Sequence, residues 1–126
     1  MRVDASNAWR SVRKRNGGSI LYMDLSPTEF LAEYKANRSW QLLDVREPWE
    51  IKIVAVPGSI RIPFAEVPSR QTELDTDKPV AVLCHSGVRS AKVADYLVNQ
   101  GFFRVANIAG GIDAWAQEVD NSLPRY

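Results

Sequence analysis

The sequence predicts an α/β protein of three layers, in which a mostly parallel central sheet is covered by helices on both faces. Two observations lead to this prediction. Short apolar segments alternate with helical segments of about ten residues, which is typical of parallel sheets with crossover helices. One apolar segment, residues 80–83, is aliphatic throughout, as expected of a central strand buried on both faces. The length of 126 residues fits one domain.

The start of the chain differs in charge from the rest. Five cationic residues and one acidic residue give the first fifteen residues a net charge of +4, although the whole chain carries only +1. The glycine pair within residues 16–19 is typical of a linker. We therefore predict that residues 1–18 form a basic, solvated and flexible N-terminal arm, and that residues 19–126 form the folded domain.

The first strand is predicted over residues 20–24, and the first helix follows it. Ser26 can accept a hydrogen bond from the Glu29 amide while the Glu29 carboxylate accepts one in return, which is a capping box. Pro27 fits the first helical position because its missing N–H needs no partner there. We expect this helix to run to about Ala36.

The remaining elements alternate in the same way. Pro63 ends one strand, Gly101 ends a helix, and Gly110 and Gly111 precede the last helix. Strands are predicted over residues 40–45, 59–62, 80–83 and 104–108, and helices over residues 90–100 and about 112–119.

The loop between the strand at 80–83 and the next helix carries the residues that are able to take part in catalysis. Because ligands of open α/β sheets bind at the carboxyl ends of the strands, this loop lies where a site is expected. We predict Cys84 as the catalytic residue. The predicted substrate-binding residues follow it directly: His85, Ser86, Gly87, Val88, Arg89 and Ser90.

A glycine, a helix start and an arginine around one cysteine favour an anionic sulfur nucleophile. Gly87 permits the unusual backbone dihedrals by which successive amides turn inward and bind an anion, and the helix dipole acts at the same place. Arg89 can add a guanidinium that grips two oxygens of a tetrahedral anion. A lone cysteine at a strand end is commonly an inert core residue, but these neighbours favour catalysis over that alternative.

The spacing within the loop indicates which group is transferred. Cysteine phosphatases place five residues between cysteine and arginine, whereas Cys84 and Arg89 are separated by four. The smaller loop favours transfer of sulfur over transfer of a phosphoryl group. His85 is adjacent to Cys84, which makes direct proton transfer awkward, so we interpret it as a polar or partly cationic wall of the pocket.

Four motifs together resemble the single-domain rhodanese (thiosulfate sulfurtransferase) family over residues 25–126. They are Asp44-Val-Arg-Glu-Pro-Trp-Glu50, Val56-Pro-Gly-Ser-Ile-Arg-Ile-Pro63, the loop from Cys84 to Ser90, and Ile108-Ala-Gly-Gly-Ile-Asp-Ala-Trp115. The end of the chain is also similar to the rhodanese domain fused to adenylyltransferases of molybdopterin and thiamine-related pathways. The resemblance implies a sulfurtransferase that moves a sulfane sulfur from thiosulfate or a similar donor to a thiophilic acceptor through a Cys84 persulfide. The implied cycle needs no metal or organic cofactor.

The resemblance also assigns supporting roles. Asp44 is expected to hydrogen-bond the active loop, and Arg46 to form a structural ion pair with Glu50, four residues on. Trp40, Trp49 and Trp115 are expected in the core. One departure concerns the donor: many thiosulfate-active members have Arg where this chain has His85.

The alternatives are a non-catalytic sulfur-carrier or partner-binding module and, less favoured, a cysteine phosphatase or arsenate reductase. Expected partners are a small anionic sulfur donor and a thiol or sulfur-acceptor protein. The near-neutral charge argues against nucleic acid, and apolar runs far shorter than about 20 residues argue against a membrane. One Cys and one His cannot form a Cys/His zinc site, and a free thiol without a targeting segment favours the cytoplasm.

Overall fold

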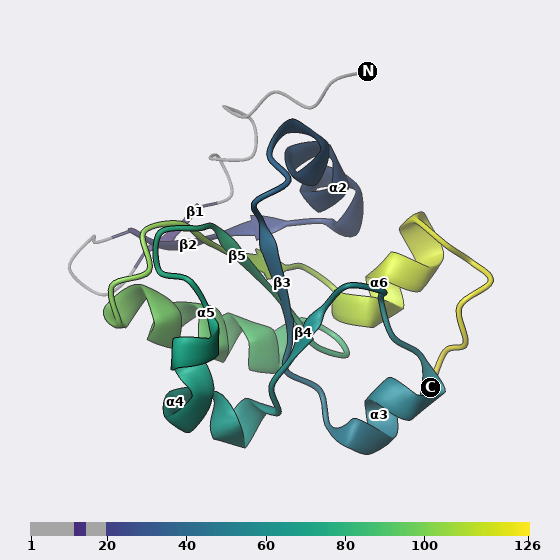
Figure 1. The fold of residues 1–126 in the computed structure, drawn as a ribbon. Coiled ribbons are helices and arrows are strands. Elements are labelled where there is room, and N and C mark those ends of the chain that lie inside the picture. The colour runs from purple at the N-terminus through teal and green to yellow at the C-terminus, as the bar shows by residue number, and fades with distance from the viewer. Residues whose placement is uncertain (1–11, 15–19) are drawn as a thin grey trace.

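The computed structural model of the protein describes residues 12–14 and 20–126 and contains one central sheet (Figure 1). In this part of the chain the sheet has the strand order β1-β2-β6-β5-β3-β4. Strands β2, β6, β5, β3 and β4 run parallel, and β1 pairs antiparallel with β2 at one edge. The prediction of a mostly parallel α/β sheet is therefore confirmed. The strands are β1 (Val12–Lys14), β2 (Ile20–Leu25), β3 (Gln41–Asp44), β4 (Ile60–Arg61), β5 (Val80–Leu83) and β6 (Val105–Ile108).

Helices cover both faces of the sheet, which gives the three predicted layers (Figure 1). The α-helices are α2 (Pro27–Ala36), α3 (Pro48–Ile53), α4 (Val67–Arg70), α5 (Val88–Asn99) and α6 (Gly111–Glu118). Two short 3₁₀ helices, η2 (Phe64–Glu66) and η3 (Gln71–Glu73), flank α4.

Strand β5 faces both halves of the core. Val80 and Val82 pack with residues of α4 and α5, whereas Ala81 and Leu83 pack with residues of α2 and α6. Because alternate side chains of a strand point to opposite faces, a strand between two helical layers has to be apolar at every position. All four residues of β5 are fully buried, as predicted.

The predicted helix start at Ser26 is confirmed. The Glu29 amide donates to Ser26 Oγ at 3.1 Å, and the Ser26 amide donates to the Glu29 carboxylate at 2.8 Å. The other predicted elements are also present, with ends that differ by one or two residues. The helical segments α3 and η2-α4-η3 were not predicted, because each is too short to show a repeating apolar face in the sequence.

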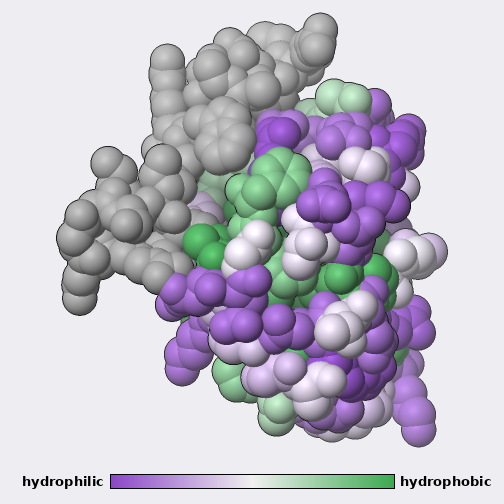
Figure 2. Space-filling model, turned by 60° about the vertical axis from the view of Figure 1, so that its left-hand side comes forward, coloured by the Kyte–Doolittle hydropathy of each residue, from purple (hydrophilic) through white to green (hydrophobic). Residues whose placement is uncertain are grey.

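Most of the predicted N-terminal arm, residues 1–11 and 15–18, lies outside the described residues. Residues 12–14 of that arm form β1. In the part of the chain that the structure describes, no helix has the length and apolar character needed to cross a membrane. Figure 2 shows hydrophilic side chains over much of one face, with hydrophobic ones gathered in smaller patches between them.

Candidate active site

The loop after β5 lies at a switch point of the sheet. Helix α5 follows β5 and packs on one face, while α6 follows the neighbouring strand β6 and packs on the other face. The two connections therefore diverge at the carboxyl edge of the strands, the usual place of the ligand site in open α/β sheets. Cys84 is the first residue after β5 and lies in this place.

The Cys84 sulfur is buried, but its neighbours are polar. The side chain is 1% exposed. Its Sγ accepts a hydrogen bond from the Gly87 amide at 3.1 Å and lies 3.2 Å from Ser90 Oγ. Gly87 has φ = 100°, a left-handed conformation in which glycine carries no steric penalty. The loop thus turns a backbone amide and a hydroxyl oxygen toward the sulfur.

Ser90 is hydrogen-bonded to further polar residues, Asn107 and through it Asp24, which were not predicted as part of the site. The buried Ser90 hydroxyl donates to Asn107 Oδ1. Asn107 Nδ2 in turn donates to Asp24 Oδ1 at 3.1 Å and to the Gly87 carbonyl at 3.4 Å. A signal was present in the sequence, because an asparagine inside a buried aliphatic strand needs partners for its amide group.

Helix α6 holds the start of the loop through its first amides. The Ile112 amide donates to the Cys84 carbonyl at 2.8 Å, and the Asp113 amide donates to the His85 carbonyl at 3.1 Å. A Cβ on Gly111 would lie 2.4 Å from both of these carbonyl oxygens. The glycine therefore permits the close approach of α6 to the loop.

The Arg89 guanidinium pairs with a carboxylate of α3. It donates to both oxygens of Glu50, at 2.7 and 2.9 Å, and Glu50 is 2% exposed. The hydrogen bond from Arg89 lowers the pKa of Glu50 to about 2, and the same bond raises the pKa of Arg89. The expected contact between Arg89 and a donor anion stays a prediction, since a donor would meet a guanidinium that is already paired.

The expected ion pair between Arg46 and the Glu50 carboxylate is wrong. Arg46 donates to both oxygens of Asp44, with a closest distance of 2.7 Å, and it reaches Glu50 only at its backbone carbonyl, 3.3 Å away. It also donates to the Val54 carbonyl at 2.8 Å. The fully buried pair of Arg46 and Asp44 therefore connects the middle and the C-terminal end of α3 to the end of β3. The expected hydrogen bond from the active loop to Asp44 is replaced by this pairing with Arg46.

The remaining loop residues, His85, Ser86 and Val88, are more exposed than Cys84. His85 is half-buried, Ser86 is exposed, and Val88 is 64% exposed. The His85 ring stacks on that of Tyr126, with centroids 4.1 Å apart and planes 18° apart. Tyr126 lies beyond the last predicted helix, at about 112–119, and its contacts across the fold leave no local pattern in the sequence.

Two of the three tryptophans expected in the core are there. Trp40 and Trp115 are each 5% exposed. Trp49 is 60% exposed and packs edge-on against Tyr126, so its expected burial is wrong.

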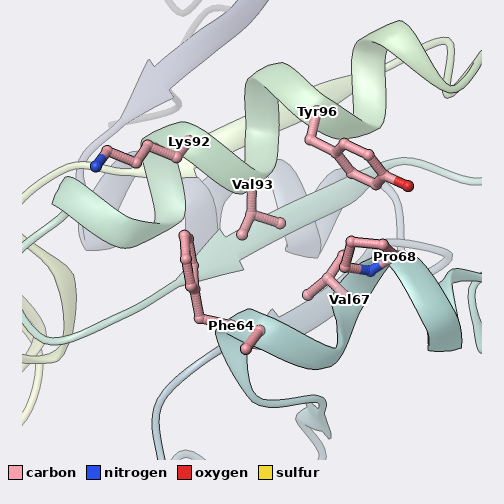
Figure 3. Close-up of a pocket in the computed structure, with 7 residues that line it drawn as sticks. Phe64, Val67, Pro68, Lys92, Val93 and Tyr96 are labelled. Atoms are coloured by element: carbon pink, nitrogen blue, oxygen red, sulfur yellow. The ribbon is translucent and has the colours of Figure 1, made fainter.

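A separate apolar pocket of about 300 Å³ lies between α5 and the η2-α4 segment. Figure 3 shows Val93 and Tyr96 pointing across it toward Phe64, Val67 and Pro68. On α5 its lining begins at Lys92, and it includes no residue of the loop from Cys84 to Ser90. The pocket is therefore distinct from the candidate active site.

Known proteins are similar to this chain in sequence and in fold. Residues 26–118 match the sequence profile of the rhodanese-like domain. The chain is 44% identical over 90 residues to "Rhodanese-like/PpiC domain-containing protein 12, chloroplastic" of Arabidopsis thaliana, covering 68% of this chain and 30% of that protein. It is 41% identical over 76 residues to "Sulfurtransferase" of Allochromatium vinosum, covering 60% of this chain and 71% of the relative.

A third relative is "Putative sulfur carrier protein YrkF" of Bacillus subtilis, with 33% identity over 77% of this chain and 52% of the relative. The chain thus spans about half or less of the length of two of these relatives. Among solved structures, the rhodanese-related protein of Thermoplasma volcanium superimposes with a TM-score of 0.69 and 33% identity, covering 78% of this chain and 94% of that one.

Proposed function

The chain belongs to the rhodanese-like domain family, and we propose that it is a sulfurtransferase that carries a sulfane sulfur on Cys84 as a persulfide. The observation that supports this most is the convergence of the Gly87 amide and the Ser90 hydroxyl on Cys84 Sγ. The Gly87 N–H donates to sulfur, and the Ser90 hydroxyl lies close enough to rotate and donate to it as well. Such donors favour the anionic form of sulfur, both as the attacking thiolate and as the persulfide that follows.

In the proposed first step the Cys84 thiolate attacks the outer sulfur of thiosulfate. A new S–S bond forms on Cys84 while the S–S bond of thiosulfate breaks, and sulfite leaves with the electron pair of that bond. In the second step an acceptor thiolate attacks the outer sulfur of the persulfide, takes it over, and releases the Cys84 thiolate. Charge and atoms balance in both steps, and the enzyme returns to its starting state.

Thiosulfate or a similar small anion is the proposed donor, and a thiol or a sulfur-acceptor protein is the proposed acceptor. The pairing of Arg89 with Glu50 and the presence of His85 beside Cys84 leave the loop less cationic than two free guanidinium groups would. We therefore expect modest affinity for thiosulfate. A reducing compartment such as the cytoplasm is the proposed location, since a persulfide cycle needs a free thiol.

The decisive experiment measures the intact mass after incubation with thiosulfate and removal of the excess. The wild-type protein is expected to gain the mass of one sulfur atom, and a reductant is expected to remove it. Cys84→Ser is a sharp control, because Cys84 is the single cysteine of the sequence. No gain in wild type, or an equal gain in Cys84→Ser, would overturn the proposal.

A sulfur-carrier role is the second candidate, favoured by the relative whose printed name says sulfur carrier. The two functions differ in turnover. With thiosulfate and excess dithiol, a sulfurtransferase releases many equivalents of sulfite per protein. A carrier that needs a partner to load or unload it releases no more than one equivalent.

A further inference from the structure

Tyr126 lies far from the active loop in the sequence but contacts it in space. Its ring stacks on His85, the residue directly after Cys84, with 4.1 Å between ring centroids. Nearly parallel rings at this separation restrict one another in orientation. The ring of Tyr126 therefore sets the orientation of the His85 imidazole next to Cys84.

The hydroxyl of Tyr126 reaches the other end of the same loop through one intermediate. It donates to Glu50 Oε2 at 2.7 Å and accepts from Arg46 Nη1 at 3.2 Å. Glu50 also receives both hydrogen bonds of the Arg89 guanidinium. Burial and the hydrogen bond to Glu50 raise the pKa of Tyr126 to about 12, although Arg46 opposes this shift, so the hydroxyl keeps its proton at neutral pH.

We propose that Tyr126 is a positioning residue of the sulfurtransferase site, with its ring orienting His85 and its hydroxyl fixing Arg89 through Glu50. This inference rests on the proposed function. Among the described residues, Tyr126 makes no hydrogen bond to Cys84, so it acts through the second and sixth residues of the loop, His85 and Arg89. Removal of the ring is expected to act through His85, and removal of the hydroxyl is expected to act through Arg89.

The test compares Tyr126→Phe with Tyr126→Leu. Tyr126→Phe keeps the stacked ring and removes the hydroxyl, whereas Tyr126→Leu removes both. His85 is the only histidine of the sequence, so its imidazole signals in a ¹H–¹³C NMR spectrum need no assignment among several. An aromatic ring stacked at this distance shifts those signals away from the chemical shifts of an isolated imidazole. We expect this change in the His85 chemical shifts to remain in Tyr126→Phe and to disappear in Tyr126→Leu.

Kinetics supply the second measurement. Tyr126→Phe is expected to lower kcat/KM for thiosulfate roughly tenfold, the effect of one hydrogen bond to a charged group. Tyr126→Leu is expected to lower it further. In a His85→Ala background this extra loss should vanish, because the ring then has nothing to orient, while the loss in Tyr126→Phe should remain.

Tyr34→Leu is the matched control, because Tyr34 also stacks on an aromatic ring, that of Phe30 in α2, away from the loop. It is expected to change neither the His85 signals nor kcat/KM. The proposal is overturned if Tyr126→Leu leaves the His85 chemical shifts unchanged. It is also overturned if, in the His85→Ala background, Tyr126→Leu still lowers kcat/KM further than Tyr126→Phe does. Failure of wild type to take up sulfur would instead overturn the proposed function, and the NMR comparison would still decide whether Tyr126 orients His85.

Discussion

Ser90 shows how a single hydroxyl can serve two forms of a neighbouring sulfur. It has one proton, which it donates to Asn107 Oδ1 in this structure, so its oxygen can accept from the Cys84 thiol at 3.2 Å. When Cys84 is a thiolate, the same hydroxyl can rotate and donate to sulfur. Its position inside the fold, next to the Gly87 amide, keeps both donors close to the reacting atom.

Ser90→Ala removes this donor with little change in volume. We expect persulfide formation from thiosulfate to slow about tenfold or more, because a hydrogen bond to a charged group contributes roughly 1.5–3 kcal/mol. Timed mass spectrometry of sulfur uptake measures the rate. Ser69→Ala is the control, because Ser69 in α4 is exposed and its hydroxyl donates to the Glu66 carbonyl of η2, away from the sulfur. An unchanged rate in Ser90→Ala would show that the backbone alone stabilises the sulfur anion.

Helix α6 belongs to the active site although none of its side chains hydrogen-bonds the sulfur. Its amides at Ile112 and Asp113 bind the carbonyls of Cys84 and His85. This contact requires a backbone without a side chain at Gly111, whose φ is 60°. The motif at residues 108–115 thus has a mechanical explanation: it brings the start of one helix onto the loop of a neighbouring strand.

Gly111→Ala tests that explanation. The added Cβ would lie 2.4 Å from the Cys84 and His85 carbonyl oxygens, so the loop or the helix has to move. Gly58→Ala is the control, because Gly58 has a similar φ of 80° with open space around its Cβ. Both variants incur left-handed strain of about 1–2 kcal/mol, and Gly111→Ala should lose about 1–3 kcal/mol more through overpacking. Urea denaturation measures the difference, and equal losses would argue against a close α6–loop contact.

The elements that sequence analysis could predict are those with a local cause. Residues 80–83 predicted β5 because a strand between two helical layers is apolar throughout, and Ser26 predicted the start of α2 through its cap. The partner of Glu50 could not be predicted. Spacing pointed to Arg46, but the carboxylate binds Arg89 and Tyr126, which are 39 and 76 residues away in the chain.

At the scale of the molecule, Glu50 joins three parts of the fold. It belongs to α3, it binds Arg89 at the start of α5, and it receives the Tyr126 hydroxyl from the C-terminal tail. The Glu47 amide adds a fourth hydrogen bond, at 2.9 Å. A buried carboxylate with this many donors is favourable only while it is ionised, so the three parts depend on one charge.

This dependence predicts acid unfolding in a defined range. The pKa of Glu50 falls from 4.5 to about 2 in the folded protein, chiefly through the hydrogen bond from Arg89. Because the folded value is lower, the stabilisation is fully present above about pH 4.5 and is lost as the pH falls toward 2. The loss is on the order of 3 kcal/mol, since each pKa unit corresponds to about 1.4 kcal/mol.

Urea denaturation at several pH values between 7 and 2 measures this loss. Glu50→Gln should be less stable than wild type at neutral pH, because the amide pairs poorly with Arg89, and its stability should depend less on pH below 4.5. Glu73→Gln is the matched control, because Glu73 also pairs with an arginine, Arg70, but on the surface, where solvent weakens the interaction. It should keep the acid dependence of wild type. If Glu50→Gln kept that dependence as well, the acid sensitivity would have to come from other carboxylates, and Glu50 would not be the charge that joins α3, the active loop and the tail.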